Sequence, residues 1–139
     1  MTEILFITDI PKENQVEKLN TTLSLWIDLL NIKDYEIITT NEDTLDVIKG
    51  INSKYLVLLG KDAMKTVFPN KHSILNEAGN VYEFNGMKTF ILCSPLYFSH
   101  NPQIEWKKML NNLSMELNNN PFNTEDLRLV LDLETTSKN

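Results

Sequence analysis

The chain of 139 residues is poor in several residue types, and each shortage excludes a class of structure. Cys93 is its single cysteine, so it can form no internal disulfide and cannot hold a four-cysteine iron–sulfur cluster. No apolar run approaches the roughly 20 residues that span a bilayer. The first residues show no signal-peptide pattern. A cytoplasmic location is therefore expected, with no membrane partner.

Positive charge is also scarce. The chain has 13 lysines and arginines against 19 acidic residues, which gives a net charge of −6, and Arg128 is the only arginine. Nucleic-acid-binding domains normally carry a basic footprint. Strong autonomous binding to DNA is therefore not expected. The apolar fraction of 42% and the charged fraction of 23% are typical of a soluble globular protein of this length.

Apolar strands alternate with helical patterns along the chain. The expected elements are strands at 3–8, 35–39, 55–59 and 87–92, and helices at 14–31, 41–50, 61–68 and 104–117. Strands that alternate with crossover helices favour a parallel sheet covered on both faces. We therefore expect the α/β class, with a four-stranded, mainly parallel sheet.

One region, residues 55–102, resembles a known family. It contains an apolar strand that ends in LLGKDA at 58–63, a hairpin around Gly86, and the segment LCSPLYFSHNP at 92–102. This order is similar to the C-terminal half of the uracil-DNA glycosylase superfamily, where these places are L-L-L-G-x-x-A, a hairpin, and T-Y-H-P-S-x-L-L-R-N-P. The resemblance implies a three-layer α/β/α sandwich, in which the last segment grips DNA at the flipped base.

The resemblance also marks candidate catalytic positions. The family loop after the first strand has the pattern G-E-A/G-P-G, which corresponds here to TDIPK at 8–12. Asp9 takes the acidic position and Pro11 the proline, whereas Thr8 and Lys12 replace glycines that let the backbone approach the nucleotide. Asp9 is a candidate catalytic acid. Alternatively, it caps the following helix or faces solvent.

Ser94 stands where the family has a histidine that donates to the developing charge on the uracil oxygen. Loss of such a donor typically lowers the rate ~10²–10³-fold. Asn41 follows the second strand, where the family has an asparagine that recognises uracil, but a helix N-cap is the preferred interpretation of this residue. Trp26 and Tyr35 are interpreted as core residues instead of platforms that stack on a base. His72 lies in a polar turn and is given no function.

The loop 95–100 keeps the family's proline and an apolar tip, although the catalytic positions have changed. Candidate residues for binding DNA or a partner are Pro11, Lys12, Asn41, Pro95, Leu96, Tyr97, Phe98 and His100. In the family the apolar tip wedges into the base stack; here it could contact DNA or a protein. His100 is placed to contact phosphate or solvent.

The last residues follow a different pattern. A polar stretch at 119–124 resembles a linker, and LVLDLETT at 129–136 resembles the first motif of the DEDD 3′–5′ exonucleases. Residues i and i+2 of a strand point the same way, so Asp132 and Glu134 could bind a divalent metal pair once the rest of such a domain is present. An ordinary terminal strand with two acids is the alternative. We expect a glycosylase-like domain at 1–118, a linker at 119–124, and the start of a truncated exonuclease domain at 125–139.

Together the two resemblances imply one context. Some large tailed phages have family A DNA polymerases with a glycosylase-like domain ahead of the exonuclease domain. The expected function is a non-catalytic domain of this kind, which acts in replication through weak DNA contacts or replisome proteins in the host cytoplasm. An active uracil-DNA glycosylase in repair and a nucleobase-binding module are the alternatives. No cofactor is expected for this chain.

Overall fold

The computed structural model describes residues 3–51, 53–97 and 106–120, which divide into two compact units. The first unit takes its described residues from Met1–Pro11 and Lys33–Ser94, and the second from Lys12–Ile32 and Pro95–Asn139. Within these described ranges, no helix is both long enough and apolar enough to cross a membrane.

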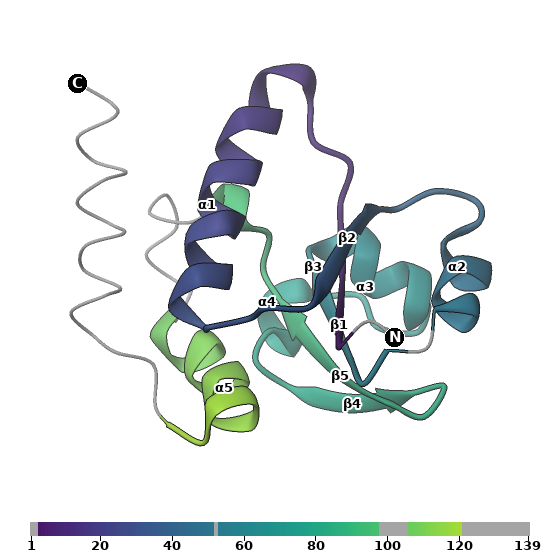
Figure 1. Ribbon diagram of the computed structural model, residues 1–139. Helices are drawn as coiled ribbons and strands as arrows, with labels where there is room; N and C mark the ends of the chain where they lie inside the picture. Colours follow the sequence, from purple (N-terminus) through teal and green to yellow (C-terminus); the bar gives the residue numbers. More distant parts are fainter. Residues whose placement is uncertain (1–2, 52, 98–105, 121–139) are drawn as a thin grey trace. The chain divides into compact units, whose positions relative to one another are not determined.

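A five-stranded sheet forms the first unit (Figure 1). Its strands are β1 (Ile4–Thr8), β2 (Tyr35–Thr39), β3 (Tyr55–Leu59), β4 (Val81–Phe84) and β5 (Met87–Leu92), in the order β2-β1-β3-β5-β4. The first four strands of that order run parallel, and β4 pairs antiparallel with β5. The predicted α/β class and mainly parallel sheet are confirmed.

The sheet has one strand more than the four that the sequence predicted. Asn85 and Gly86 both have positive φ, at 53° and 80°, as a two-residue type I′ hairpin turn requires. This turn brings β4 back along β5, with Glu83 opposite Lys88, so the outer arm of the hairpin becomes an edge strand of the sheet. The predicted hairpin therefore adds a strand to the sheet.

The helices of the first unit are α2 (Thr44–Gly50), α3 (Lys61–Val67) and α4 (Ile74–Glu77). Figure 1 shows α2 and α3 on one side of the sheet. Alternate strand residues meet them in one apolar core, made by Leu5, Ile7, Leu56, Leu58, Ile91, Ile48, Ala63, Met64, Val67 and Met87. Successive side chains of a strand point to opposite faces, so alternate residues of the fully buried strands β1 and β3 supply one face of this core.

The second unit contains η1 (Glu13–Gln15), α1 (Val16–Leu29), η2 (Pro95–Tyr97) and α5 (Trp106–Asn118). Leu19, Leu23 and Trp26 are buried along α1, which confirms the predicted helical stripe and the core position of Trp26. The helix ends at Leu29. Asn31, two residues later, has a φ of 57° and reverses the chain, and the N–H of Ile32 donates to the carbonyl of Ile27.

The end of α5 is capped by residues that the sequence assigned to a linker. Asn119 has a φ of 57°, and its N–H donates to the carbonyl of Met115. The Ser114 hydroxyl donates to the carbonyl of Asn120 over 2.8 Å. The capping contacts of α5 therefore extend to Asn120. The rest of the predicted linker and the predicted exonuclease segment, with Asp132 and Glu134, lie outside the described residues.

Candidate functional site

The carboxyl ends of the parallel strands define the candidate site. In the sheet, β1 lies between β2, the next strand in the chain, and β3, the strand after that. In open α/β sheets, ligands bind beyond the carboxyl ends of the strands, where the strand order reverses in this way. In this chain that point lies between β1 and β3. The residues that follow these strands, Asp9 and Gly60, belong to the same compact unit.

Asp9 is held against the start of α3. Its Oδ1 accepts a hydrogen bond from the Ala63 N–H at 2.8 Å, and its own N–H donates to the Leu59 carbonyl. A carboxylate at a helix N-terminus satisfies N–H groups that have no partner within the helix. Asp9 therefore caps a helix, as one of the two sequence interpretations proposed. The helix is α3, far along the chain, instead of the helix that follows Asp9.

Gly60 makes room for this contact. Its φ is 120°, a conformation that residues with a side chain rarely adopt, and a Cβ built on it would overlap the Asp9 carboxyl group. The Gly60 N–H donates to the carbonyl of Leu92, which ties the end of β3 to β5. The glycine of the LLG segment thus lets β3 turn into α3 directly over the carboxylate of Asp9.

Burial raises the pKa of the Asp9 carboxyl above its ordinary value of 3.8, and the nearby charge of Asp62 acts in the same direction. Hydrogen bonds from the backbone of Ala63, Asp62 and Lys61 lower the pKa, but burial and the Asp62 charge together outweigh them. A half-buried carboxyl with a raised pKa is a common feature of functional sites, and structural caps can show it as well.

Thr8 precedes Asp9 at the end of β1. Its hydroxyl is buried and has no hydrogen-bond partner among the described residues. Successive side chains of a strand point to opposite faces. Because β1 ends at Thr8, this alternation does not extend to Asp9, and the Asp9 carboxylate is placed by its contact with the start of α3.

The remaining predicted site residues are engaged in different local structures. Ser94 is buried, two residues after β5. Asn41 is exposed, and its Oδ1 accepts from the Asp43 N–H at 2.7 Å, in a turn that precedes α2. The Asn41 side chain is thus engaged within its own turn.

The predicted binding loop is described only in part. Pro95 is buried, Leu96 is half-buried, and both lie in η2 with Tyr97. Phe98 and His100 lie outside the described residues. Earlier in the chain, Pro11 is half-buried, and the N–H of exposed Lys12 donates to the Gln15 side chain at 3.0 Å.

Two further predictions have clear outcomes. Tyr35 was expected in the core, which is wrong: it is 41% exposed, because β2 is an edge strand and only part of its ring meets Phe6. His72 is exposed, as expected.

Burial raises the pKa of the Cys93 thiol to about 11, so this side chain stays protonated near neutral pH.

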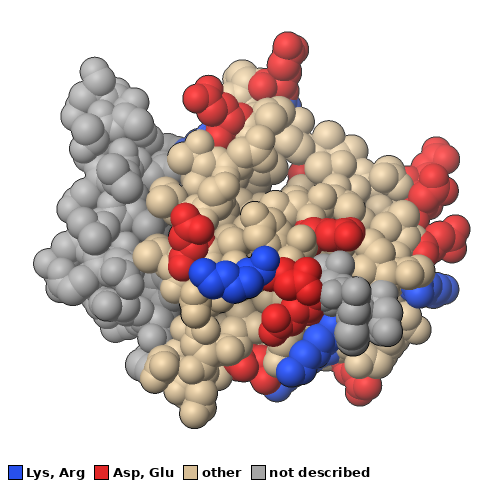
Figure 2. Space-filling model, viewed as in Figure 1, with Lys and Arg blue, Asp and Glu red and all other residues tan. Residues whose placement is uncertain are grey.

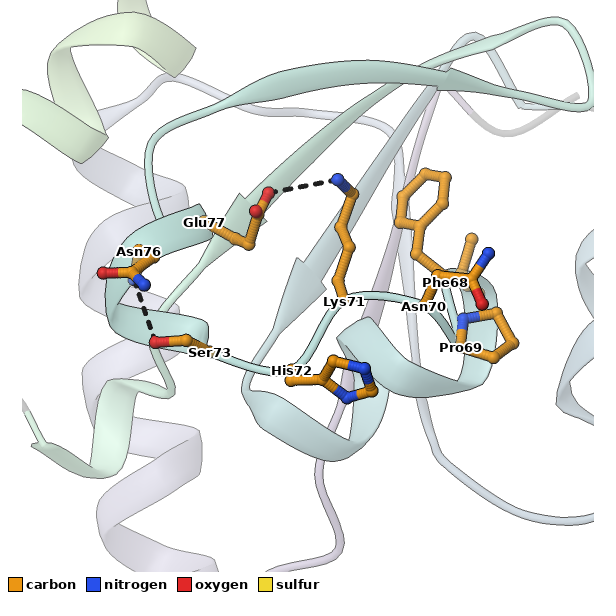
Figure 3. Close-up of a pocket in the computed structure, with 9 residues that line it drawn as sticks. Phe68, Pro69, Asn70, Lys71, His72, Ser73, Asn76 and Glu77 are labelled. Carbon is orange, nitrogen blue, oxygen red and sulfur yellow. Dashed lines mark hydrogen bonds and ion pairs between the residues drawn. The ribbon is translucent and has the colours of Figure 1, made fainter.

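Sequence patterns did not reveal a pocket of about 640 Å³ around the α3–α4 connection (Figure 3). Its lining residues are Val67, Phe68, Pro69, Asn70, Lys71, His72, Ser73, Asn76 and Glu77. The Lys71 ammonium lies 3.2 Å from Glu77 and 3.9 Å from the centre of the Tyr82 ring. Tyr82 donates its hydroxyl hydrogen to the same Glu77 carboxylate.

These three side chains satisfy one another. The hydrogen bond from Tyr82, followed by the contact with Lys71, holds the pKa of Glu77 below its ordinary value. The contacts with Tyr82 and Glu77 raise the pKa of Lys71. Because the ammonium and the carboxylate already neutralise each other, the group holds the α3–α4 connection against β4 and presents no net charge to a ligand.

No family model matches the chain, and a search of curated proteins finds no relative.

Among the described residues, no three histidine, cysteine, aspartate or glutamate side chains are grouped so that they could hold a metal ion.

Proposed function

We propose that the chain is a uracil-DNA glycosylase-like domain that no longer excises uracil and serves DNA replication as part of a phage family A DNA polymerase. The three-layer α/β/α sandwich of that superfamily is part of the proposal. The parallel strands β2, β1, β3 and β5, and the junction of β3 and α3 at Gly60, support it.

The engagement of Asp9 carries the non-catalytic part of the proposal. A carboxylate that activates water or stabilises a sugar cation must reach the substrate. The Asp9 carboxylate instead accepts from the Ala63 N–H and lies where a side chain on Gly60 would lie. Ser94, at the position of the family's histidine donor, is buried. The residues at both catalytic positions of the family are therefore part of the folded framework in this chain: Asp9 contacts the start of a helix and Ser94 is buried.

The direct test is an excision assay with single- and double-stranded oligonucleotides that contain one uracil. Purified 1–139 is expected to leave the uracil in place, so alkali treatment reveals no abasic sites above the level without protein. An active glycosylase run in parallel shows that the assay works. Abasic sites formed by 1–139 but not by Asp9→Asn would establish the active repair glycosylase instead.

The charge of the chain favours a protein partner over DNA. On the face in Figure 2, acidic side chains are spread over the described surface and the basic ones among them form no continuous patch. With a net charge of −6, electrostatic attraction to phosphates is weak. Replisome proteins are therefore the preferred partners, and the loop 95–100 remains the proposed contact.

A further inference from the structure

The free edge of β2 has the features of a strand-docking site. Among the described strands, β1 alone pairs with β2, and no other described strand lies along the opposite edge. The Asp34 carbonyl accepts from the Ile4 N–H, and the Thr40 N–H donates to the Thr8 carbonyl. Backbone groups of a strand alternate in direction, so the even-numbered residues of β2 face β1. Tyr35, Ile37 and Thr39 therefore direct their N–H and C=O groups away from the sheet.

The side chains of these same three residues lie on one face of the strand. Tyr35 is 41% exposed and Ile37 is 45% exposed, which is unusual for two large apolar side chains on neighbouring positions of a face. Edge strands are normally protected by lysine, proline, a bulge or a covering element. The strand carries none of those residues between Tyr35 and Thr39, and Glu36 is its only charge.

Charge decides the kind of occupant. Residues 33–43 contain four acidic side chains, Asp34, Glu36, Glu42 and Asp43, and one basic side chain, Lys33, and all five are exposed. Asp34 and Glu36 lie on the face opposite to Tyr35 and Ile37. A second copy of this acidic chain would bring like charges to the edge. An extended segment with apolar side chains on one face and basic ones on the other complements both faces.

We propose that the free edge of β2 binds an extended protein segment in which apolar and basic side chains alternate, and that this segment joins the sheet as a sixth strand. Backbone hydrogen bonds to Tyr35, Ile37 and Thr39 supply affinity, and the two side-chain faces supply selectivity. The inference concerns the first unit alone and is independent of whether the chain is glycosylase-like.

The test uses the full chain and a blocked octapeptide of alternating lysine and valine. Amide hydrogen exchange is followed residue by residue by NMR. In the free chain, the amides of Tyr35, Ile37 and Thr39 are expected to exchange fast, and those of Glu36 and Ile38 slowly. Saturating peptide is expected to protect the first three. An octapeptide of alternating glutamate and valine, and one with four lysines followed by four valines, are the controls and should bind at least tenfold more weakly.

Ile37→Pro supplies an independent variant. Its lost N–H points away from the sheet, so the pairing with β1 is retained. Affinity for the alternating peptide is expected to fall about tenfold or more, since a hydrogen bond and an apolar contact are both lost. Leu75→Ser, which changes an exposed apolar residue of α4, should bind as the parent chain does.

Three results would overturn the proposal. The first is peptide binding that leaves the amides of Tyr35, Ile37 and Thr39 unprotected. The second is equal binding of the alternating peptide and its two controls, or no binding of any of them. The third is protection of these amides in the absence of peptide, increasing with protein concentration, together with a dimer detected by light scattering. That result would mean that a second copy of the chain occupies the edge.

Discussion

At the scale of single residues, Asp9 combines features that are common in catalytic carboxylates with a structural contact at the start of α3. Its position after β1 and its raised pKa are common in active sites. Its contact with the Ala63 N–H accounts for the position, and the burial that goes with this position raises the pKa, although the hydrogen bond itself lowers it. Substitutions of Asp9 can separate the effect of its helix-capping hydrogen bond on stability from the effect of its negative charge.

We expect Asp9→Ala to lower the free energy of unfolding by about 1 kcal/mol, the usual loss for a helix cap. Asp9→Asn keeps an oxygen acceptor and removes a half-buried charge, so near neutral pH it should be as stable as the parent chain or more stable. Urea denaturation of the three proteins measures these differences. If Asp9→Asn loses as much as Asp9→Ala, the negative charge itself holds α3.

The difference in stability between Asp9→Asn and the parent chain should change with pH in a definite direction. The folded pKa of Asp9 lies above 3.8, so the folded state binds the proton more tightly than the unfolded state. The contribution of this group to stability therefore rises as pH falls through its folded pKa, and it levels off below 3.8. Any advantage of Asp9→Asn at neutral pH should shrink as melts are repeated at decreasing pH. An advantage that grows instead would contradict the raised pKa.

Gly60 gives a second prediction at this scale. Gly60→Ala should lower the free energy of unfolding by about 1–3 kcal/mol, because the positive φ disfavours a side chain and the new methyl group displaces the Asp9 carboxylate. Gly50→Ala is the matched control, since nothing lies within 4 Å of its added Cβ. That control, at the end of α2, should be neutral or slightly stabilising. Equal effects of the two changes would show that the contact at Gly60 is unimportant.

At the scale of elements, the boundary of α5 has a sharper test than the sequence suggested. Truncation after Asn120 should leave the melting temperature nearly unchanged, because the cap formed by Asn119 and Asn120 is retained. Truncation after Asn118 removes that cap and should lower the melting temperature. The two truncated chains and 1–139 are compared by circular dichroism.

A large drop for the chain that ends at Asn120 would mean that residues after it stabilise the described part. The predicted domain boundary would then be wrong. Equal melting temperatures for both truncated chains would mean that the Asn119–Asn120 cap contributes little.

At the scale of the whole molecule, the net charge affects which class of partner the proposed contact loop 95–100 can bind. If it contacts DNA, affinity for an oligonucleotide should be weak and should fall steeply with salt. If it contacts a replisome protein, affinity should depend on Tyr97 and Phe98 and vary little with salt. Tyr97→Ser and Phe98→Ser, measured against both ligands over a salt series, separate the two cases. Unchanged binding to both ligands would remove the loop from the proposed function.

Much of the local structure was predictable from the sequence. The apolar runs at 4–8 and 55–59, and the helical stripe from Leu19 to Trp26, identified strands and a helix, because each pattern depends on neighbours within a few residues. The alternation of these elements also determined the α/β class and the mainly parallel sheet.

Only the tertiary structure decided which distant residues meet. The capping of α3 by Asp9 joins residues 54 positions apart, whose local patterns give no information about each other. The contacts of Lys71 and Tyr82 with Glu77 likewise depend on how the α3–α4 connection packs on β4. The exposure of Tyr35 has the same origin. A strand pattern predicts a strand, but the order of strands in the sheet, set by crossover connections, decides that β2 lies at an edge.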